Sequence, residues 1–255
     1  LLALLAPVLA LEIENLERLN ASLSEISNIH SFEHLLDEML RRNSSLGGWR
    51  GWPRDCSDLP ISSPSGTYAI QPMGYQTILV YCEMGGTDGG WTVIQRNRQD
   101  TAITWDESWR SYKYGFGNVQ GEFWLGTEYI YQITKQRAYQ VRFVIWDESD
   151  NKNFADYNMF RLDDESQGYR LRLGAHSGTA EDAMASMSTI IMHDNMKFST
   201  KDQDQDTFSG NCASISGGGW WYSACYSVQL NIKGPLTWGN LCNGNCRASA
   251  ILIKP

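Results

Sequence analysis

The first part of the chain carries apolar residues at a helical spacing. No Gly, Pro, Cys or Trp occurs between Leu11 and Arg42, and apolar side chains recur every three or four positions, at Ile13, Leu16, Leu19, Leu23 and Ile26. This spacing predicts a helix over residues 11–46 whose apolar stripe matches the seam of a short coiled coil. Two interpretations follow: the stripe joins copies of the chain into a homo-oligomer, or it packs against the chain's own globular domain.

From residue 47 onward the pattern changes to short apolar runs separated by Gly-rich turns. Runs of β-branched and aromatic residues predict strands over residues 75–82 and 91–95, and alternation of apolar and polar residues predicts strands over 139–146 and 169–173. Thr127 is expected to cap a short helix that ends at Gln136. No strand–helix–strand alternation is visible, so we expect one α+β domain over residues 47–255, with an antiparallel sheet and short helices.

Composition narrows the classes of partner. Hydrophobic residues make up 42% and charged residues 20% of the 255 positions, as in a folded globular chain. The net charge is −8, and the longest basic run is the pair Arg41 and Arg42. A nucleic acid or an anionic membrane surface needs a concentrated basic patch, so neither partner is expected.

Several features predict a secreted, extracellular protein. Residues 1–10 are apolar but shorter than the roughly 20 residues that span a bilayer, so membrane insertion is not expected. They are typical of the end of a signal peptide, although they could also simply begin the following helix. Asn20 and Asn43 lie in glycosylation sequons. The six cysteines include no C-x-x-C pair, and their even number allows full pairing in an oxidising compartment.

Catalytic motifs are missing from the sequence. It has four histidines, and neither H-E-x-x-H nor G-x-S-x-G occurs. The glycine run from Gly115 to Gly121 has one residue too many for a dinucleotide-binding turn. We therefore expect a binding protein and not an enzyme.

An acidic loop is the sharpest candidate for a metal site. Asp202, Asp204 and Asp206 alternate with polar residues, and carboxylates together with free backbone carbonyls are the oxygen ligands that calcium prefers. An EF-hand is excluded, because Thr207 stands where its loop needs Gly and Ala213 stands where it needs Glu. The alternative is a solvated acidic loop without a metal.

The segments around this loop resemble the fibrinogen C-terminal domain family. The similar segments follow one another in family order: Asp55–Leu59, Ser65–Pro72, Val80–Met84, Asp88–Arg96, Tyr112–Gly117, Gly121–Gly126, Tyr169–Gly174, Ser177–Ala180, Phe198–Ala213 and Gly218–Tyr222. The resemblance implies the family's globular domain over residues 47–255. A short helix before a single such domain, without collagen repeats, is the plan of the shortest fibrinogen-like proteins.

The resemblance also implies specific pairings and ligands. Family members pair the cysteines that match Cys56 with Cys82 and Cys212 with Cys225. Their calcium site takes the side chains that match Asp204 and Asp206 and the carbonyls that match Phe208 and Gly210, with Asp202 as an outer-sphere helper. They also carry a cis peptide bond at the position of Ala224 and Cys225.

The chain departs from the family around the ligand pocket. Many relatives that bind acetylated sugars have His where this chain has Tyr226, so we place a candidate pocket at Ser216, Trp221, Ala224 and Tyr226. The aromatic run that contains Trp221 is typical of a core, although it could also stack on a sugar.

Two further cysteines, Cys242 and Cys246, match no pair that is common to the family. They are expected to bridge each other across a short loop; a free or intermolecular thiol is the alternative.

These observations predict a secreted, calcium-stabilised recognition protein. It would act as a soluble ligand or humoral immune factor by binding a cell-surface or extracellular protein receptor. The alternative is a ficolin-like lectin for acetylated glycans. A clot or matrix component would need the fibrin peptide pocket, which Tyr226 disfavours.

Overall fold

The computed structural model describes residues 52–85, 88–185 and 190–255. The chain divides into two units, Leu1–Ser45 and Leu46–Pro255. The predicted signal segment, the helix over residues 11–46 and the sequons at Asn20 and Asn43 therefore lie outside the described residues, and the fold below is that of the second unit.

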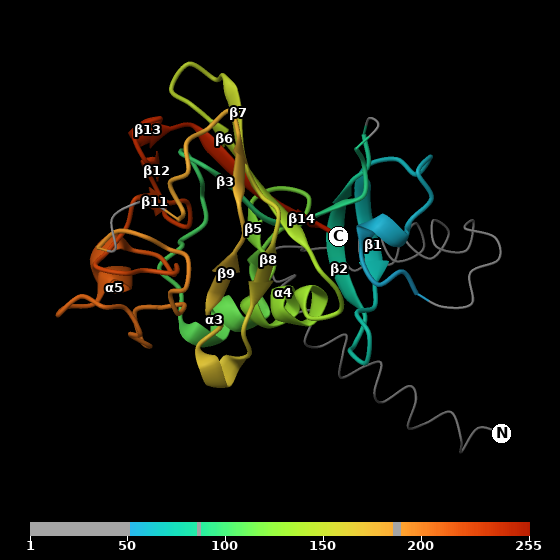
Figure 1. Ribbon diagram of the computed structural model, residues 1–255, viewed down its shortest axis with the longest axis horizontal. Helices are drawn as coiled ribbons and strands as arrows, with labels where there is room; N and C mark the ends of the chain where they lie inside the picture. The colour runs from blue at the N-terminus through green and yellow to red at the C-terminus, as the bar shows by residue number, and fades with distance from the viewer. Residues whose placement is uncertain (1–51, 86–87, 186–189) are drawn as a thin grey trace. The chain divides into compact units, whose positions relative to one another are not determined.

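The main element is an antiparallel sheet whose central strand comes last in the sequence. Its path runs β1-β2-β3-β14-β6-β7-β10, and the two short strands β4 and β5 join it beside β3. The last strand, β14, thus pairs with β3 on one side and with β6 on the other (Figure 1). The strands are β1 (Gly66–Ile70), β2 (Ile78–Glu83), β3 (Trp91–Arg98), β4 (Phe116–Gly117), β5 (Phe123–Trp124), β6 (Gln140–Trp146), β7 (Lys152–Tyr157), β10 (His176–Gly178) and β14 (Ala248–Lys254).

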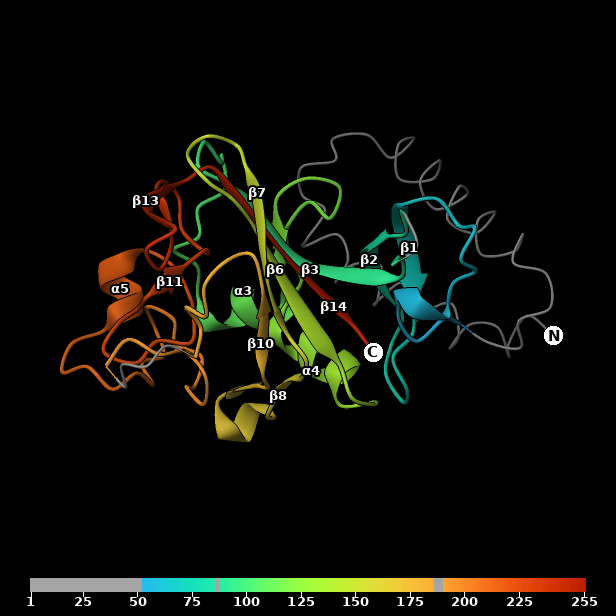
Figure 2. The ribbon, with the colours of Figure 1, turned by 45° about the horizontal axis from the view of Figure 1, so that its top comes forward.

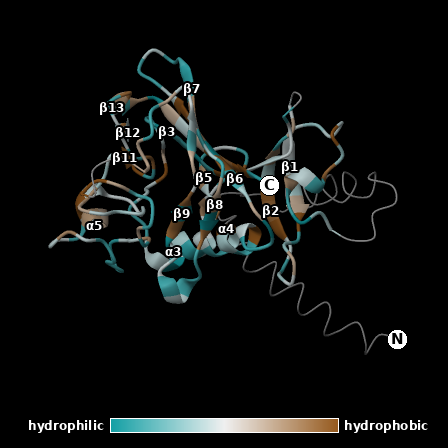
Figure 3. Ribbon diagram, in the orientation of Figure 1, coloured by the Kyte–Doolittle hydropathy of each residue, from teal (hydrophilic) through white to brown (hydrophobic). Residues whose placement is uncertain are grey.

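The pattern of apolar residues explains the strands of this sheet. Val141, Phe143 and Ile145 alternate along β6, and all three are fully buried. In β14, residues 249–253 are buried without alternation, as expected for a strand in the middle of a sheet that is covered on both faces. Figure 3 shows apolar residues along β2 and polar residues at the turn between β6 and β7. The predicted α+β class with antiparallel sheet is confirmed.

Short helices lie beside the sheet, and α3 packs against α4 (Figures 1 and 2). The helical elements are α3 (Trp109–Tyr114), α4 (Thr127–Thr134), α5 (Cys212–Ser216) and the two 3-10 turns η1 (Cys56–Asp58) and η2 (Glu165–Gln167).

The expected cap of α4 is wrong. Gly126, with φ of 118°, is the N-cap, and the Thr127 hydroxyl donates to the Tyr112 carbonyl oxygen at 3.3 Å. Gly126 is required there, because a Cβ would approach the Lys113 carbonyl oxygen to 2.8 Å.

Two smaller antiparallel sheets complete the described part of the chain. One comprises β11 (Val228–Gln229), β12 (Leu236–Trp238) and β13 (Cys242–Cys246), and it lies near α5 in both ribbon views (Figures 1 and 2). The other pairs β8 (Phe160–Leu162) with β9 (Leu171–Leu173).

An aromatic core supports the acidic loop. The Trp124 ring stacks on Phe198 with centroids 5.8 Å apart, and Trp221 meets both rings edge to face. All three side chains are at most 1% exposed. Phe198 immediately precedes the acidic loop, and Trp221 lies three residues before the cis peptide. Because both rings are packed in this core, it holds the start of each segment in position.

Candidate functional site

The acidic loop starts from a short backbone bridge. Ser199 and Trp220 exchange two backbone hydrogen bonds, of 2.9 and 3.1 Å. Gln205 then folds back: its backbone N–H donates to the Ser199 hydroxyl at 2.9 Å, and its side chain donates to the Phe198 carbonyl oxygen at 2.9 Å. These bonds hold residues 200–210 as a compact turn above the aromatic core.

Asp202, the first carboxylate of the loop, faces α3. Its Oδ1 accepts hydrogen bonds from the Trp109 N–H at 2.7 Å and from the Thr200 hydroxyl at 2.8 Å. Partial burial opposes ionisation, but these hydrogen bonds outweigh it and lower the pKa of Asp202. Lys201 adds a bond to the Asp106 carbonyl oxygen at 2.6 Å. Asp202 is therefore an anchor between the loop and α3, which the expectation of an outer-sphere helper did not foresee.

Asp204 and Asp206 form the second part of the loop. The Asp206 carboxylate accepts the N–H groups of Phe208 at 2.9 Å and Cys212 at 2.8 Å, one on each oxygen. Asp204 accepts the Asp206 N–H at 3.2 Å. Burial and the neighbouring charge of Asp204 raise the pKa of Asp206. The two carboxylates thus repel each other in a site that favours an added positive charge.

The donor chemistry of this loop fits a hard cation. Each Asp206 oxygen accepts one backbone hydrogen bond and keeps a second lone pair. Within the described part of the chain, no donor bonds to the carbonyl oxygens of Phe208 and Gly210. No cluster of three or more His, Cys, Asp or Glu side chains suited to a metal is present in residues 52–85, 88–185 and 190–255. A metal here would therefore depend on main-chain carbonyls, as calcium sites commonly do.

A disulfide and a cis peptide border the loop. Cys212, whose N–H bonds Asp206, is joined to Cys225, and the Ala224–Cys225 peptide is cis, as the resemblance implied. The Thr207 N–H donates to the Ser223 carbonyl oxygen at 3.1 Å, so the loop and the cis-peptide segment form one unit. The other cysteines pair as Cys56–Cys82 and Cys242–Cys246, which are also the expected pairs.

The candidate pocket does not contain all four expected residues at the surface. Ser216 and Ala224 are half-buried, and Tyr226 is 37% exposed, with its ring edge-to-face to Tyr222. Trp221 is only 1% exposed, and its indole N–H donates to the Tyr169 carbonyl oxygen at 2.9 Å. Trp221 is thus a core residue and offers no face to a ligand.

Four exposed apolar residues lie in the acidic loop, in α5, or in segments linked to them by the Cys212–Cys225 disulfide and a backbone hydrogen bond, and we call them the apolar patch: Ile190, Phe208, Ile215 and Tyr226. A Cβ on Gly210 would lie 3.0 Å from the Phe208 ring and 3.8 Å from Ile215, so both side chains lie beside that glycine. The backbone carbonyl oxygen of Ile190 accepts the Ala224 N–H at 2.8 Å, so the Ile190 backbone lies beside the segment that leads to Tyr226. Sequence reasoning missed this patch, because only the long-range contacts bring its members together.

His193 is a buried residue beside this region that the sequence did not single out. Its Nε2 accepts the N–H groups of Val228 at 2.9 Å and Ser227 at 3.2 Å, which places the ring proton on Nδ1, and Nδ1 donates to the Trp221 carbonyl oxygen at 2.8 Å. Burial lowers its pKa to about 4. His193 is therefore a neutral structural residue that cross-links the backbone.

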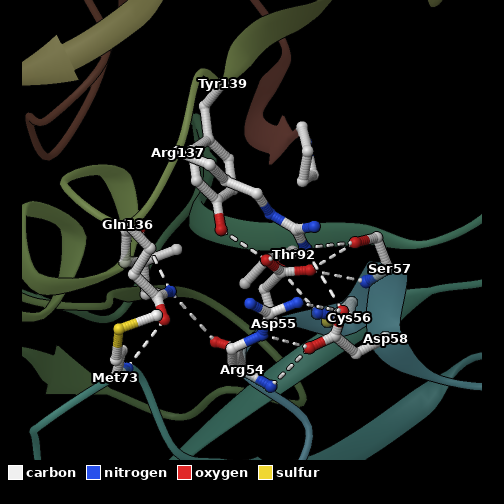
Figure 4. A network of polar contacts seen from close by, with 12 residues as sticks. Arg54, Asp55, Cys56, Ser57, Asp58, Met73, Thr92, Gln136, Arg137 and Tyr139 are labelled. Carbon is white, nitrogen blue, oxygen red and sulfur yellow. Dashed lines mark hydrogen bonds and ion pairs between the residues drawn. The ribbon is translucent and has the colours of Figure 1, made fainter.

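In a second charged cluster, drawn in Figure 4, the charged side chains bond to one another and to neighbouring protein groups. The Asp55 side chain, 1% exposed, accepts hydrogen bonds from Arg137 at 2.6 Å, from the Ser57 hydroxyl at 2.6 Å, from the Ser57 N–H at 2.8 Å and from the Tyr139 hydroxyl. Asp58 joins Arg54 in an ion pair at 2.9 Å. The Asp55 oxygens are occupied by protein donors, so this cluster holds η1 against the segment just before β6.

Comparisons with known proteins agree with this architecture. The family model for the fibrinogen beta and gamma chains, C-terminal globular domain, matches residues 52–245. A fibrinogen-like protein 1-like protein of Gallus gallus is 52% identical over 194 residues, which cover 75% of this chain and 69% of the relative. Angiopoietin-related protein 1 of Homo sapiens is 44% identical over 174 residues, 67% of this chain and 34% of the relative. The chain thus spans about a third of the angiopoietin-related protein.

Solved structures show the same fold. The fibrinogen-like globe domain of human ANGPTL6 aligns with a TM-score of 0.72 and 35% identity, covering 80% of this chain and 96% of that domain. The lamprey fibrin D-dimer, in complex with the peptide ligand Gly-His-Arg-Pro-amide, aligns with a TM-score of 0.74 and 26% identity, covering 100% of this chain and 90% of that one. Among the described residues, no helix has the length and apolar character needed to cross a bilayer.

Proposed function

Because the chain belongs to the fibrinogen C-terminal domain family, we propose that it is an extracellular recognition protein that binds other proteins through the surface around its acidic loop. The apolar patch is the observation that carries this proposal. Ile190, Phe208, Ile215 and Tyr226 are 62%, 43%, 70% and 37% exposed. Apolar and aromatic side chains gathered on a disulfide-braced surface are typical of protein-binding sites. The receptor would be a cell-surface or extracellular protein, in keeping with a soluble ligand or humoral immune factor.

We further propose that calcium shapes this surface. Asp204 and Asp206 would hold the ion through their side chains, and Phe208 and Gly210 through their carbonyl oxygens. When bound, the ion would neutralise the two carboxylates. The backbone N–H groups of Phe208 and Cys212 donate to Asp206. A bound ion that fixes the Asp206 carboxylate would therefore also fix the backbone of Phe208, in the apolar patch, and of Cys212, the first residue of α5.

A binding experiment tests the recognition proposal. The purified protein would be applied to an array of extracellular receptor domains and immobilised glycans as wild type, as Ile215→Asp and as the matched control Ile61→Asp. Ile61 is 78% exposed but lies between η1 and β1, outside the apolar patch. We expect Ile215→Asp to lose a receptor that the wild type and Ile61→Asp both bind. Equal binding by all three proteins would refute the role of the patch, and binding only to glycan ligands would favour the lectin alternative.

Thermal unfolding tests the calcium proposal. A ligand that binds only the folded state raises the melting temperature as its concentration exceeds its Kd. We expect calcium to raise it for the wild type and for Asp100→Ala, an exposed carboxylate outside the loop, but not for Asp204→Ala. Magnesium should act weakly, because it requires tighter octahedral geometry. A full calcium response in Asp204→Ala would overturn the ligand assignment.

A further inference from the structure

The loop closed by the Cys242–Cys246 bridge contains a reactive sequence that the recognition site does not use. Its cysteines are four positions apart and at most 2% exposed, and Asn243, Gly244 and Asn245 lie between them. Asn243 and Gly244 form the only Asn–Gly dipeptide in the chain. The disulfide anchors both ends of this loop in the protein and leaves Asn243 exposed.

Asn243 differs from its neighbours in how its side chain is held. The Asn240 amide donates to Glu181 at 3.3 Å, and the Asn245 amide donates to Glu148 at 2.6 Å. Within the described part of the chain, every other asparagine makes a side-chain hydrogen bond, and Asn243 makes none. Its amide carbon is therefore free to rotate toward the backbone that follows.

The residue after Asn243 leaves that approach open. Gly244 has φ of 77° and no side chain, and outside its two chain neighbours even an added Cβ would meet no atom closer than the Pro235 Cβ, at 4.0 Å. The Gly244 N–H donates to the Thr237 hydroxyl at 3.0 Å, and Thr237 is 6% exposed within β12. Attack by the Gly244 nitrogen requires it to lose that proton, so the hydrogen bond opposes the reaction.

We propose that Asn243 is a site of spontaneous deamidation whose rate is restrained by Thr237. Hydroxide removes the Gly244 amide proton, the nitrogen bonds to the Asn243 side-chain carbon, and the amide group leaves as ammonia after taking up a proton. Water then opens the resulting succinimide. Attack at the side-chain carbonyl gives aspartate, and attack at the main-chain carbonyl gives isoaspartate. Either product adds one negative charge to the exposed loop, and isoaspartate also lengthens the disulfide-closed ring by one backbone atom.

Timed incubation of the full chain tests this proposal. Samples held at mildly alkaline and mildly acidic pH would be digested without reduction. The peptides containing aspartate and isoaspartate, which have equal mass, would be separated by chromatography, and mass spectrometry would quantify each product at each asparagine. We expect modification at Asn243 ahead of Asn240 and Asn245, faster at the alkaline pH. Asn243→Gln should remove it, and Asn240→Gln, the matched control, should leave its rate unchanged.

Two substitutions of Thr237 test whether its hydroxyl slows the reaction. Thr237→Val removes the hydroxyl that accepts the Gly244 N–H and should speed the reaction several-fold, whereas Thr237→Ser keeps the hydroxyl and should react like the wild type. Melting curves would verify that each variant is folded. Equal or slower modification in a folded Thr237→Val protein would overturn the restraint. Equal modification of Asn240, Asn243 and Asn245 in the native wild type would overturn the site.

Discussion

At the scale of single residues, the buried carboxylate of Asp55 shows how this fold replaces the hydrogen bonds that a charged group makes with water. A carboxylate that leaves water needs protein donors in place of the hydrogen bonds it loses. Asp55 obtains them from η1, through Ser57, and from the segment just before β6, through Arg137 and Tyr139. Burial, together with the Asp55 charge, raises the pKa of Tyr139, which keeps that hydroxyl a donor. The cluster in Figure 4 thus joins segments about eighty residues apart in sequence.

Removing Arg137 should therefore destabilise the protein. Arg137→Gln leaves the buried Asp55 charge without its cationic partner, and we expect a loss of about 2–3 kcal/mol in the free energy of unfolding, at the low end for such changes because three donors remain. Urea unfolding measures it. Arg98→Gln is the control: Arg98 pairs with Asp100 on the surface, where the change should cost less than about 0.5 kcal/mol. Equal losses in the two variants would contradict this account.

His193 should make the protein sensitive to acid. Its pKa is about 4 in the folded state, below its ordinary value of 6.5, so the unfolded chain binds the extra proton first. Stability from this residue is present above pH 6.5 and is lost as the pH falls toward 4, by up to about 3 kcal/mol. Urea midpoints measured across this range should fall more steeply for the wild type than for His193→Gln. Parallel curves would refute the role of His193.

At the scale of elements, the disulfides should contribute unequally. Cys56–Cys82 ties η1 to β2 across 26 positions, whereas Cys242–Cys246 closes a loop within β13 across four. In the chain-entropy account, removing the first bridge by paired Cys→Ala changes costs about 3.5 kcal/mol and removing the last costs about 2 kcal/mol. Thermal unfolding of the two double variants gives the order. A larger loss for the shorter loop would show that packing of the buried sulfurs dominates.

The acidic loop should separate into an anchor and a metal site. Asp202→Ala removes two hydrogen bonds to a charged acceptor, so we expect a loss of about 1–3 kcal/mol without calcium. Asp202→Ala should still gain melting temperature on calcium addition, while Asp204→Ala should be nearly as stable as the wild type without calcium and gain nothing from it. A reversal of these two responses would contradict the division.

Elements were more predictable from sequence than the way they meet. The alternation of Val141, Phe143 and Ile145 predicted β6, because a sheet with a buried face imposes that pattern directly. Thr127 was misassigned as a cap, since its hydroxyl finds a partner in α3, which no local rule contains. Trp221 was placed in a pocket because the family pattern gives its position in sequence and not its orientation. The apolar patch was missed because a disulfide and the Ala224 backbone, both long-range contacts, bring its members together.

At the scale of the whole molecule, the surface should discriminate against simple acetylated sugars. The resemblance set out above implies that Tyr226 takes the place of a His in sugar-binding members of the family. Loss of a polar contact in such a site costs about 1–3 kcal/mol, roughly a ten- to hundredfold drop in affinity. Calorimetric titration with N-acetylglucosamine in calcium should therefore show no binding at millimolar sugar. Binding that disappears in Tyr226→Ala would instead support the lectin alternative.

The central place of β14 has a consequence for biogenesis. A ribosome synthesises β3 and β6 well before residues 248–254, so the two halves of the sheet emerge with facing edges that still lack the strand between them. Strand edges with unpaired N–H and C=O groups can pair with strands of other chains and aggregate. Pairing between segments more than 100 residues apart in sequence is also slow. The sheet of the nascent protein therefore cannot close, and its core stays accessible to solvent, until β14 has been synthesised. We therefore expect aggregation of the nascent protein to depend on how well its folding compartment shields those edges during that interval.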